Sequence, residues 1–174
     1  MDKDQLAGNS DQATDFLGNT QSFDCMGCAI ANRKIEAPGG LIYEGDHAVI
    51  AGDPEVPIPG FLIVNAKRHI RSFSELDSAE RHEVIDIVAC AEKALRELGV
   101  ADEVTVVQEE RSKHLHVWVF PYHDWMSEQF GKGIKYLRDI TEYARAHAEP
   151  SVLDETMATI EKVRKYFTEH QISE

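Results

Sequence analysis

Basic residues are in short supply in this sequence. Its 174 residues include 18 lysines and arginines against 31 aspartates and glutamates, which gives a formal net charge of −13. A general nucleic-acid binder gains affinity by neutralising phosphates with many such cations, so this chain should repel long polyanions. We therefore expect no nucleic-acid polymer among its partners.

Long apolar runs are also missing. The longest, such as residues 61–64, are far too short to cross a bilayer, and residues 1–4 do not have the layout of a signal peptide. These features predict a cytoplasmic protein that has no membrane partner.

Cysteine is rare. The sequence contains only Cys25, Cys28 and Cys90, and the first two have the CysxxCys spacing. In a reducing compartment this pattern favours a metal-binding pair and one core thiol over disulfide stapling. Two unliganded core cysteines are an alternative, as is a thioredoxin-like redox pair, although the redox motif lacks the strand expected before it.

The sequence does contain enough apolar residues, 43%, for one globular domain with a sizeable core. Residues 1–20 are polar with few apolar anchors, which predicts a mobile or loosely docked arm. The patterns that follow predict a short helix over residues 29–35, a hairpin of strands 41–44 and 48–51, strands 61–65 and 104–107, and a long helix over residues 78–98 that stops at Gly99.

The C-terminal part, residues 127–174, is predicted to be a helical extension. A loop over residues 122–133 carries Trp125, and two amphipathic helices follow, the second capped by Ser151 with Asp154. We expect these helices to pack on the domain or on a partner subunit. Their apolar positions are Ile134, Leu137, Ile140 and Ala144 in the first helix, and Leu153, Met157, Ile160, Val163 and Phe167 in the second.

Residues 113–121 alternate with the period of a β-strand. Two histidines on one strand face either bind or catalyse something, or they belong to a half-exposed strand that only meets water. Basic residues gather here and at residues 67–71; they form one positive pocket for a small phosphorylated ligand if the fold joins them, and two solvated turns otherwise. One strand face carries Leu115, Val117 and Val119, and the other carries His114, His116, Trp118 and Phe120.

The order of these motifs resembles the histidine-triad superfamily of nucleotide hydrolases and nucleotidyl transferases. CysxxCys is followed by the hairpin, an aspartate before a Pro-Gly corner, a strand, Lys-Arg-His at residues 67–69, the long helix, a strand, and His-apolar-His at residues 114–116. The resemblance covers residues 23–125. It implies an α+β domain over residues 21–126, with a five-stranded antiparallel sheet and one long helix, and a homodimer.

The resemblance also implies that His116 is the nucleophile. One ring nitrogen would be held by the backbone carbonyl of the preceding triad residue, while the other attacks the α-phosphorus and forms a nucleotidyl-histidine. The third triad position departs from the family because it holds Trp118, whose N–H can donate a hydrogen bond but cannot shuttle a proton. Asp53 matches the family's ribose-binding residue, although Asp-Pro is also a common turn opener.

A second departure lies at residues 108–113. Family members often carry a glycine-bearing phosphate loop here, whereas this sequence has a short charged turn. Gln108, Arg111 and Ser112 are the expected phosphate contacts, and Glu109 and Glu110 would oppose them.

For the metal, the resemblance implies a ligand set. His69 and His114 would join Cys25 and Cys28 in a closed tetrahedral zinc site, whose role is structural because it leaves no position for substrate. Rival histidine ligands are His47 and His123.

Three functions therefore compete. The first is a hydrolase or nucleotidyl transferase that uses His116 on a dinucleoside polyphosphate or nucleoside phosphoramidate. The second is a nucleotide-binding module with little or no catalysis. The third is a zinc-stabilised interaction protein in which the C-terminal helices form the working surface.

Overall fold

The computed structural model describes residues 10–110, 112–170 and 172. Its centre is an antiparallel five-stranded sheet with the order β3-β4-β5-β7-β6. The predicted α+β class, with such a sheet and one long helix, is confirmed. The strands are β3 (Leu41–Glu44), β4 (Ala48–Gly52), β5 (Leu62–Ala66), β6 (Glu103–Val107) and β7 (His116–Tyr122).

Strand β7 divides its side chains between two cores, as the alternation predicted. Val117 and Val119 belong to the larger core, while Phe120 belongs to a second core and Trp118 packs against it. In the pairing with β5, Asn65 lies opposite His116 and Ile63 opposite Trp118. The predicted face with His116, Trp118 and Phe120 therefore exists on the side of the second core, whereas His114 lies just before the strand begins.

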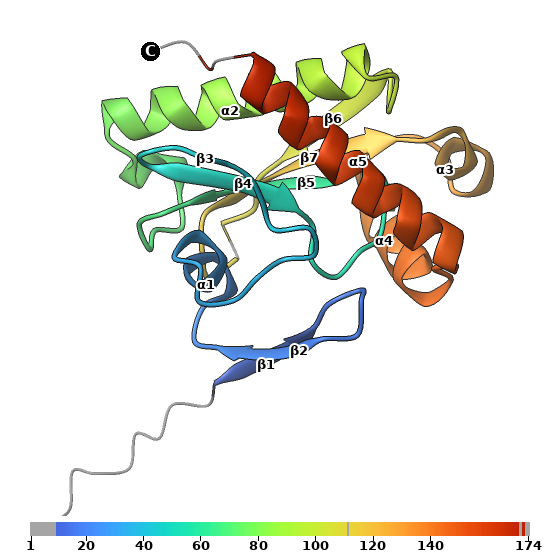
Figure 1. Cartoon of the computed structure of the whole chain (residues 1–174), viewed down its shortest axis with the longest axis horizontal. Coiled ribbons are helices and arrows are strands. Elements are labelled where there is room, and N and C mark those ends of the chain that lie inside the picture. The colour runs from blue at the N-terminus through green and yellow to red at the C-terminus, as the bar shows by residue number, and fades with distance from the viewer. Residues whose placement is uncertain (1–9, 111, 171, 173–174) are drawn as a thin grey trace, which may run out of the picture.

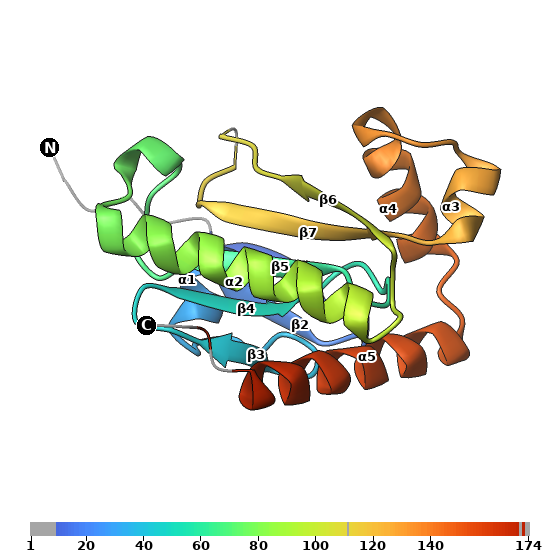
Figure 2. The ribbon, with the colours of Figure 1, turned by 90° about the horizontal axis from the view of Figure 1, so that it is seen from above.

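Helix α2 (Ser78–Glu97) covers the face of the sheet that bears the larger core (Figures 1 and 2). It begins in a capping box, in which the side chains of Asp77 and Glu80 each accept from the other's backbone N–H. Gly99 follows the C-cap with φ of +66°, a conformation in which glycine has no steric cost. The predicted helix and its glycine stop are both confirmed.

Helix α5 (Pro150–Glu169) lies beside α2 and over the edge strand β3, and it adds Ile160, Val163 and Phe167 to the larger core (Figure 2). The predicted cap by Ser151 is wrong, because the helix begins one residue earlier and Glu149 is its N-cap without a side-chain bond. Proline suits the first helical position because its missing N–H would have no partner there.

The opposite face of the sheet is partly covered by α3 (Asp124–Gln129) and α4 (Leu137–Ala146). Met126 of α3 and Leu137 and Ile140 of α4 pack with Phe61 and Phe120 in the second core. Helix α3 lies within the stretch predicted to be a loop, and a 3-10 turn, Ile134–Tyr136, precedes α4.

The N-terminal part adds a hairpin of β1 (Asp11–Thr14) and β2 (Thr20–Phe23), in and just after the stretch predicted to be a mobile or loosely docked arm. Residues 1–9 of that arm lie outside the described residues. The hairpin and α1 (Met26–Ala31) lie on the side of the sheet opposite α2 (Figure 1). Helix α1 starts earlier than the predicted 29–35 because Cys25 caps it.

Within the described ranges, the structure contains no helix that is both long enough and apolar enough to cross a bilayer.

Candidate active site and metal centre

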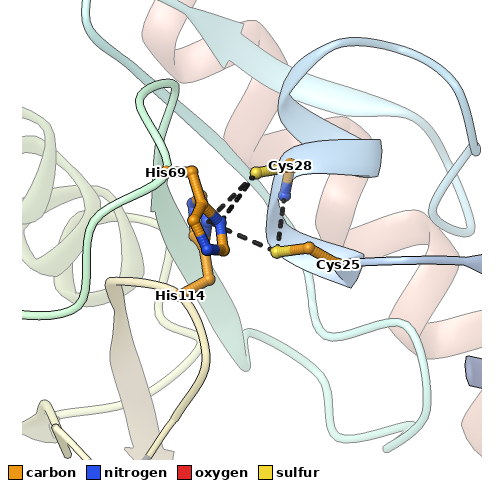
Figure 3. A group of neighbouring side chains, drawn as sticks. All are labelled: Cys25, Cys28, His69 and His114. Carbon is orange, nitrogen blue, oxygen red and sulfur yellow. Dashed lines mark hydrogen bonds between the residues drawn. The ribbon is translucent and has the colours of Figure 1, made fainter. Parts of the chain in front are cut away.

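Four potential metal ligands converge from three parts of the chain (Figure 3). Cys25 and Cys28 come from the start of α1, His69 follows β5, and His114 precedes β7. The Nδ1 atom of His114 lies 3.5 Å from the Sγ of Cys25 and 3.4 Å from that of Cys28. The Nδ1 atom of His69 lies 3.2 Å from the Sγ of Cys28, and all four ligand atoms lie within 4.8 Å of one another.

These distances fit a tetrahedral ion. Zinc–sulfur and zinc–nitrogen bonds of about 2.3 and 2.0 Å give tetrahedral edges of about 3.3 to 3.8 Å. The Nε2–H of His114 donates to the carbonyl of Ala66 at 2.7 Å, so Nδ1 keeps its lone pair for the centre of the group. The donor set and its orientation therefore fit a metal ion.

Gly27 is what allows His114 to approach α1 so closely. A Cβ atom at this position would lie 2.3 Å from Cδ2 and 2.5 Å from Cγ of the imidazole. No side chain larger than hydrogen fits between the two cysteines while the ring stays in place. The glycine in the CysxxCys motif is thus part of the site.

The surroundings of Cys28 favour its protonated thiol. Burial, followed by the neighbouring Cys25, raises the pKa of Cys28 to about 11, so a nearby cation would favour the thiolate form of this residue at neutral pH. Of the rival ligands, His123 donates its Nε2–H to the carbonyl of Pro59 at 2.8 Å, and His47 is outside the described group.

Two neighbouring oxygen atoms hold the imidazole ring of His116 through its Nδ1 atom. Its Nδ1 lies 3.1 Å from the carbonyl oxygen of His114 and 3.2 Å from the hydroxyl of Ser112. Because a carbonyl oxygen can only accept, Nδ1 carries the proton and Nε2 keeps its lone pair. Burial lowers the pKa of His116, which favours this neutral form. The carbonyl contact expected from the resemblance is present.

His116 lies where two cavities meet. A first cavity of about 310 Å³ and a second of about 670 Å³ share Ser112, His116 and Trp118 as lining residues. The first has apolar walls from α1 and the sheet, and its polar lining includes Asp53, Asn65 and Lys113. Both volumes are within the usual range of small-molecule sites.

Asp53 lies on the wall of the first cavity. Its Oδ1 accepts the backbone N–H groups of Glu55 and Val56 at 2.9 and 2.8 Å, while Oδ2 has no hydrogen bond among the described residues. Burial raises the pKa of Asp53 to about 6, although these two bonds and the charge of Arg145 oppose the rise. The residue is therefore both a turn opener, as one reading predicted, and a free acceptor at the cavity.

Asn65 was not predicted to be a site residue. Its side chain is 3% exposed, lines the first cavity, and makes no hydrogen bond with the part of the chain that the structure describes. Since no buried side-chain polar atom is left unsatisfied there, its amide opens onto the cavity. A lone asparagine in an apolar strand was the available signal, because a buried amide needs a partner.

Trp118 separates the two cavities. It packs edge-to-face on Phe61, with ring centroids 5.1 Å apart, and its indole N–H has no hydrogen-bond partner among the described residues. The residue thus fills part of the site and still offers a donor.

Two of the predicted phosphate contacts, Gln108 and Ser112, lie in different places. Ser112 lies beside the rear nitrogen of His116, whereas Gln108 lines neither cavity and donates its side-chain N–H to the carbonyl of Arg71 at 3.2 Å. Arg111 lies outside the described residues.

The basic cluster at residues 67–71 does not supply the pocket with charge. Lys67 pairs with Glu44 at 3.1 Å, and Arg68 pairs with Glu80 at 2.8 Å. Arg71 reaches the other basic cluster, but it donates to the carbonyls of residues 110 and 112. Lys113 lines the first cavity with His116 but pairs with Asp11 at 2.7 Å, and the second cavity takes its cations from the C-terminal part.

The family model described as the HIT domain matches residues 34–124, more than half of the chain. The chain belongs to the HIT domain family. Both imidazoles of the His-x-His motif and Trp118 fall within the match, whereas Cys25, Cys28 and α4 lie outside it. No curated protein matches this HIT protein.

Solved structures share the fold of this HIT protein. A hypothetical histidine triad nucleotide-binding protein from Sulfolobus tokodaii has 20% identity and a TM-score of 0.57, with 83% of this chain and 94% of that chain covered. A zinc-bound histidine triad family protein from Mycobacterium smegmatis has 16% identity and a TM-score of 0.57, with 84% and 97% covered. A HIT family member from Bacillus subtilis has 20% identity and a TM-score of 0.53, with 80% and 96% covered.

Proposed function

We propose that this HIT protein is a nucleotide phosphate hydrolase or nucleotidyl transferase that acts through a covalent nucleotidyl-histidine on His116. The observation that carries the proposal is the ring's setting. Its Nδ1–H is tied back to the carbonyl of His114, which leaves an unprotonated Nε2 at the junction of two cavities. A neutral imidazole with one free lone pair is a competent nucleophile near pH 7.

The reaction has two steps. The lone pair of Nε2 attacks the α-phosphorus, a nitrogen–phosphorus bond forms, and the bond from phosphorus to the leaving group breaks with its electron pair on the leaving atom. Water, or another acceptor hydroxyl, then attacks phosphorus and gives up a proton, and the nitrogen–phosphorus electron pair returns to Nε2. Ser112 holds the proton side of the ring throughout, through its 3.2 Å contact with Nδ1.

The first cavity would bind the nucleoside. Its apolar walls, which include Ile30 and Ile63, suit a base, and the free oxygen of Asp53 suits ribose hydroxyls. Asn65 offers an amide on the same side as His116, where a phosphate oxygen could accept from it. The nucleotide-binding description of the Sulfolobus protein is consistent with this use.

The metal that we propose for the Cys25, Cys28, His69 and His114 group is one structural zinc ion. Two thiolates and two imidazoles are a zinc ligand set, and the four ligands would close the coordination shell against substrate. Bound zinc would hold α1, the exit of β5 and the entry of β7 together, which positions the strand that carries His116. All three cysteines are free, which suits a reducing compartment such as the cytoplasm.

A homodimer is the proposed assembly. Strand β6 is an edge of the sheet, and its Val106 is 44% exposed, so it could pair with a second copy. Light scattering during gel filtration should give twice the mass of 19.6 kDa; a monomer mass would contradict it.

A nucleotide-binding module is the second candidate function. Trp118 favours it, because an indole in place of the third histidine cannot donate a proton to a leaving group. This candidate predicts nucleotide binding without turnover. The third candidate, a zinc-stabilised interaction protein, would show neither nucleotide binding nor turnover.

The test compares His116→Ala with His82→Ala, a histidine exposed on α2 and far from the site in the fold. Both variants and the wild type are assayed with diadenosine tetraphosphate and adenosine phosphoramidate, and adenosine monophosphate binding is followed by calorimetry. We expect His116→Ala to lose turnover by about a thousandfold or more and to keep binding, while His82→Ala matches the wild type. Wild-type turnover that survives in His116→Ala would rule out the proposed mechanism.

A further inference from the structure

The second cavity is built largely by a part of the chain outside the HIT match. Its far wall comes from the 3-10 turn Ile134–Tyr136 and from α4, whereas its near wall is β6, β7 and the turn between them. At about 670 Å³ it is roomier than the nucleoside cavity and has space for a second group of similar size. His116 opens onto both, so a substrate centred on it would have one half in each.

One face of α4 carries the charge of this cavity. Arg138, Thr141, Glu142 and Arg145 are spaced three and four residues apart, which places them on one side of the helix, while Ile140 is buried in the second core. Lys135 joins them from the preceding turn (α4 is labelled in Figure 1).

The cations that line this cavity outnumber the acids. Neither arginine has an ion pair among the described residues, and the ammonium of Lys135 lies over the ring of Tyr136, 4.6 Å from its centroid. The acids that line the cavity are Glu142 and Glu109. In a chain with a net charge of −13, this is a locally cationic wall beside the nucleophile.

The chemistry of Trp118 favours a leaving group that suits this cationic wall, namely an anion. An amine can leave phosphorus only if its nitrogen gains a proton, because a free amine has a conjugate-acid pKa of about 10 and its anion is inaccessible. A phosphate leaving group ionises at a pKa of about 6 and departs as an anion without an acid. A site whose third triad residue cannot deliver a proton is therefore better suited to a phosphate than to an amine.

We propose that the second cavity binds a phosphate-bearing leaving group, and that this HIT protein prefers phosphoric anhydride substrates to phosphoramidates. The inference rests on the proposed function and narrows it to one substrate class. When Nε2 of His116 bonds to the α-phosphorus, the anhydride oxygen leaves with the electron pair of the broken bond. Arg138 and Arg145 hold the resulting charge by charge-assisted hydrogen bonds. The leaving phosphate is part of a second nucleotide or of a sugar phosphate.

The kinetic test measures a ratio of kcat/KM values. Diadenosine tetraphosphate, a nucleoside diphosphate sugar and adenosine phosphoramidate are assayed with the wild type, Arg138→Ala, Arg145→Ala and the double variant. Each single change should lower the ratio of anhydride to phosphoramidate turnover by about tenfold, the typical effect of losing a charged hydrogen bond. The more active anhydride identifies the source of the phosphate.

Lys132→Ala is the matched control. This lysine precedes the same wall, but it pairs with Glu103 at 2.8 Å and does not line the cavity. Its ratio should equal that of the wild type. A ratio that is unchanged in the double variant, or that falls equally in Lys132→Ala, would overturn the proposal.

A binding measurement separates this inference from the proposed function. If the wild type turns over none of the three substrates, the proposed function fails, and calorimetry with inorganic pyrophosphate then decides the anion site alone. A dissociation constant that rises about tenfold or more in the double variant, but not in Lys132→Ala, supports the site. Equal dissociation constants in all three proteins contradict it.

Discussion

At the scale of single residues, a backbone carbonyl fixes one ring nitrogen of each histidine in the His-x-His motif, and this sets the direction of the other nitrogen. His114 uses Nε2 on the carbonyl of Ala66 and so turns Nδ1 to the cysteines, while its own carbonyl orients His116. His114 therefore contributes both to the group of potential metal ligands and to the orientation of His116, the proposed nucleophile.

Asp53 gives a prediction in which function and stability diverge. Its folded pKa of about 6 lies above the ordinary 3.8, so between these values the folded protein binds more protons than the unfolded chain. The free energy of unfolding therefore falls as the pH rises through this window, and the ionised carboxylate of Asp53 destabilises the folded protein at pH 7. Asp53→Asn removes the charge and keeps an oxygen for the N–H groups of Glu55 and Val56.

We expect Asp53→Asn to be more stable than the wild type by about 1–2 kcal/mol at pH 7, with the difference vanishing near pH 4. Urea unfolding at both pH values measures this. The same variant should bind adenosine monophosphate several-fold more weakly, since a carboxylate accepts ribose hydroxyls better than an amide does. A variant that is less stable at pH 7 and binds equally well would contradict both roles.

At the scale of elements, α1 is a short helix whose first turn carries the two thiols of the CysxxCys motif. It has six residues, and Cys25 is both its N-cap and a potential ligand. A helix this short is marginal by itself, so tertiary contacts must hold it. A bound ion would supply such a contact, since the other ligands lie at the ends of β5 and β7.

Metal removal should therefore act on the whole domain. We expect the purified protein to contain about one zinc ion per chain, and a chelator or Cys25→Ser to remove it and lower the Tm by many degrees. Cys90→Ser is the control, because this thiol packs at the larger core and lies outside the ligand group. Atomic absorption and thermal unfolding measure both effects. Full zinc content in Cys25→Ser would be incompatible with the ligand assignment.

Gly27→Ala tests the close approach of α1 and His114. Alanine normally stabilises a helix by about 1 kcal/mol relative to glycine. Here its Cβ would meet the imidazole at 2.3 Å, so we expect a lower Tm and a lower zinc content. A rise in Tm with full zinc content would show that the ring can move aside without cost.

The elements also show what the sequence could predict. The hairpin, β5, β6 and α2 were predicted because each has a strong apolar period and clear stop signals, such as Gly99. The β1–β2 hairpin and α3 were not, because the first is polar and made by backbone pairing, and the second is six residues long. Asn65 was missed because only the fold shows that it faces His116.

At the scale of the whole molecule, the two cavities lie at the seam between the HIT match and what surrounds it. The first cavity is lined by α1 and the N-terminal hairpin, where Lys113 pairs with Asp11 at 2.7 Å. The second cavity is closed by α4. Local patterns predicted the helices of the C-terminal extension, but they could not predict that α4 joins the second core and lines a cavity with Trp118 through its arginines.

We expect His116 to become covalently nucleotidylated during turnover. The direct measurement is intact-protein mass spectrometry on the wild type, quenched at alkaline pH within milliseconds of mixing with diadenosine tetraphosphate, followed by mapping of the modified residue. A transient adduct of one adenylyl group should appear on His116. It should be absent from His116→Ala and present in His82→Ala. Full turnover in which no adduct forms, or an adduct on another residue, would contradict it.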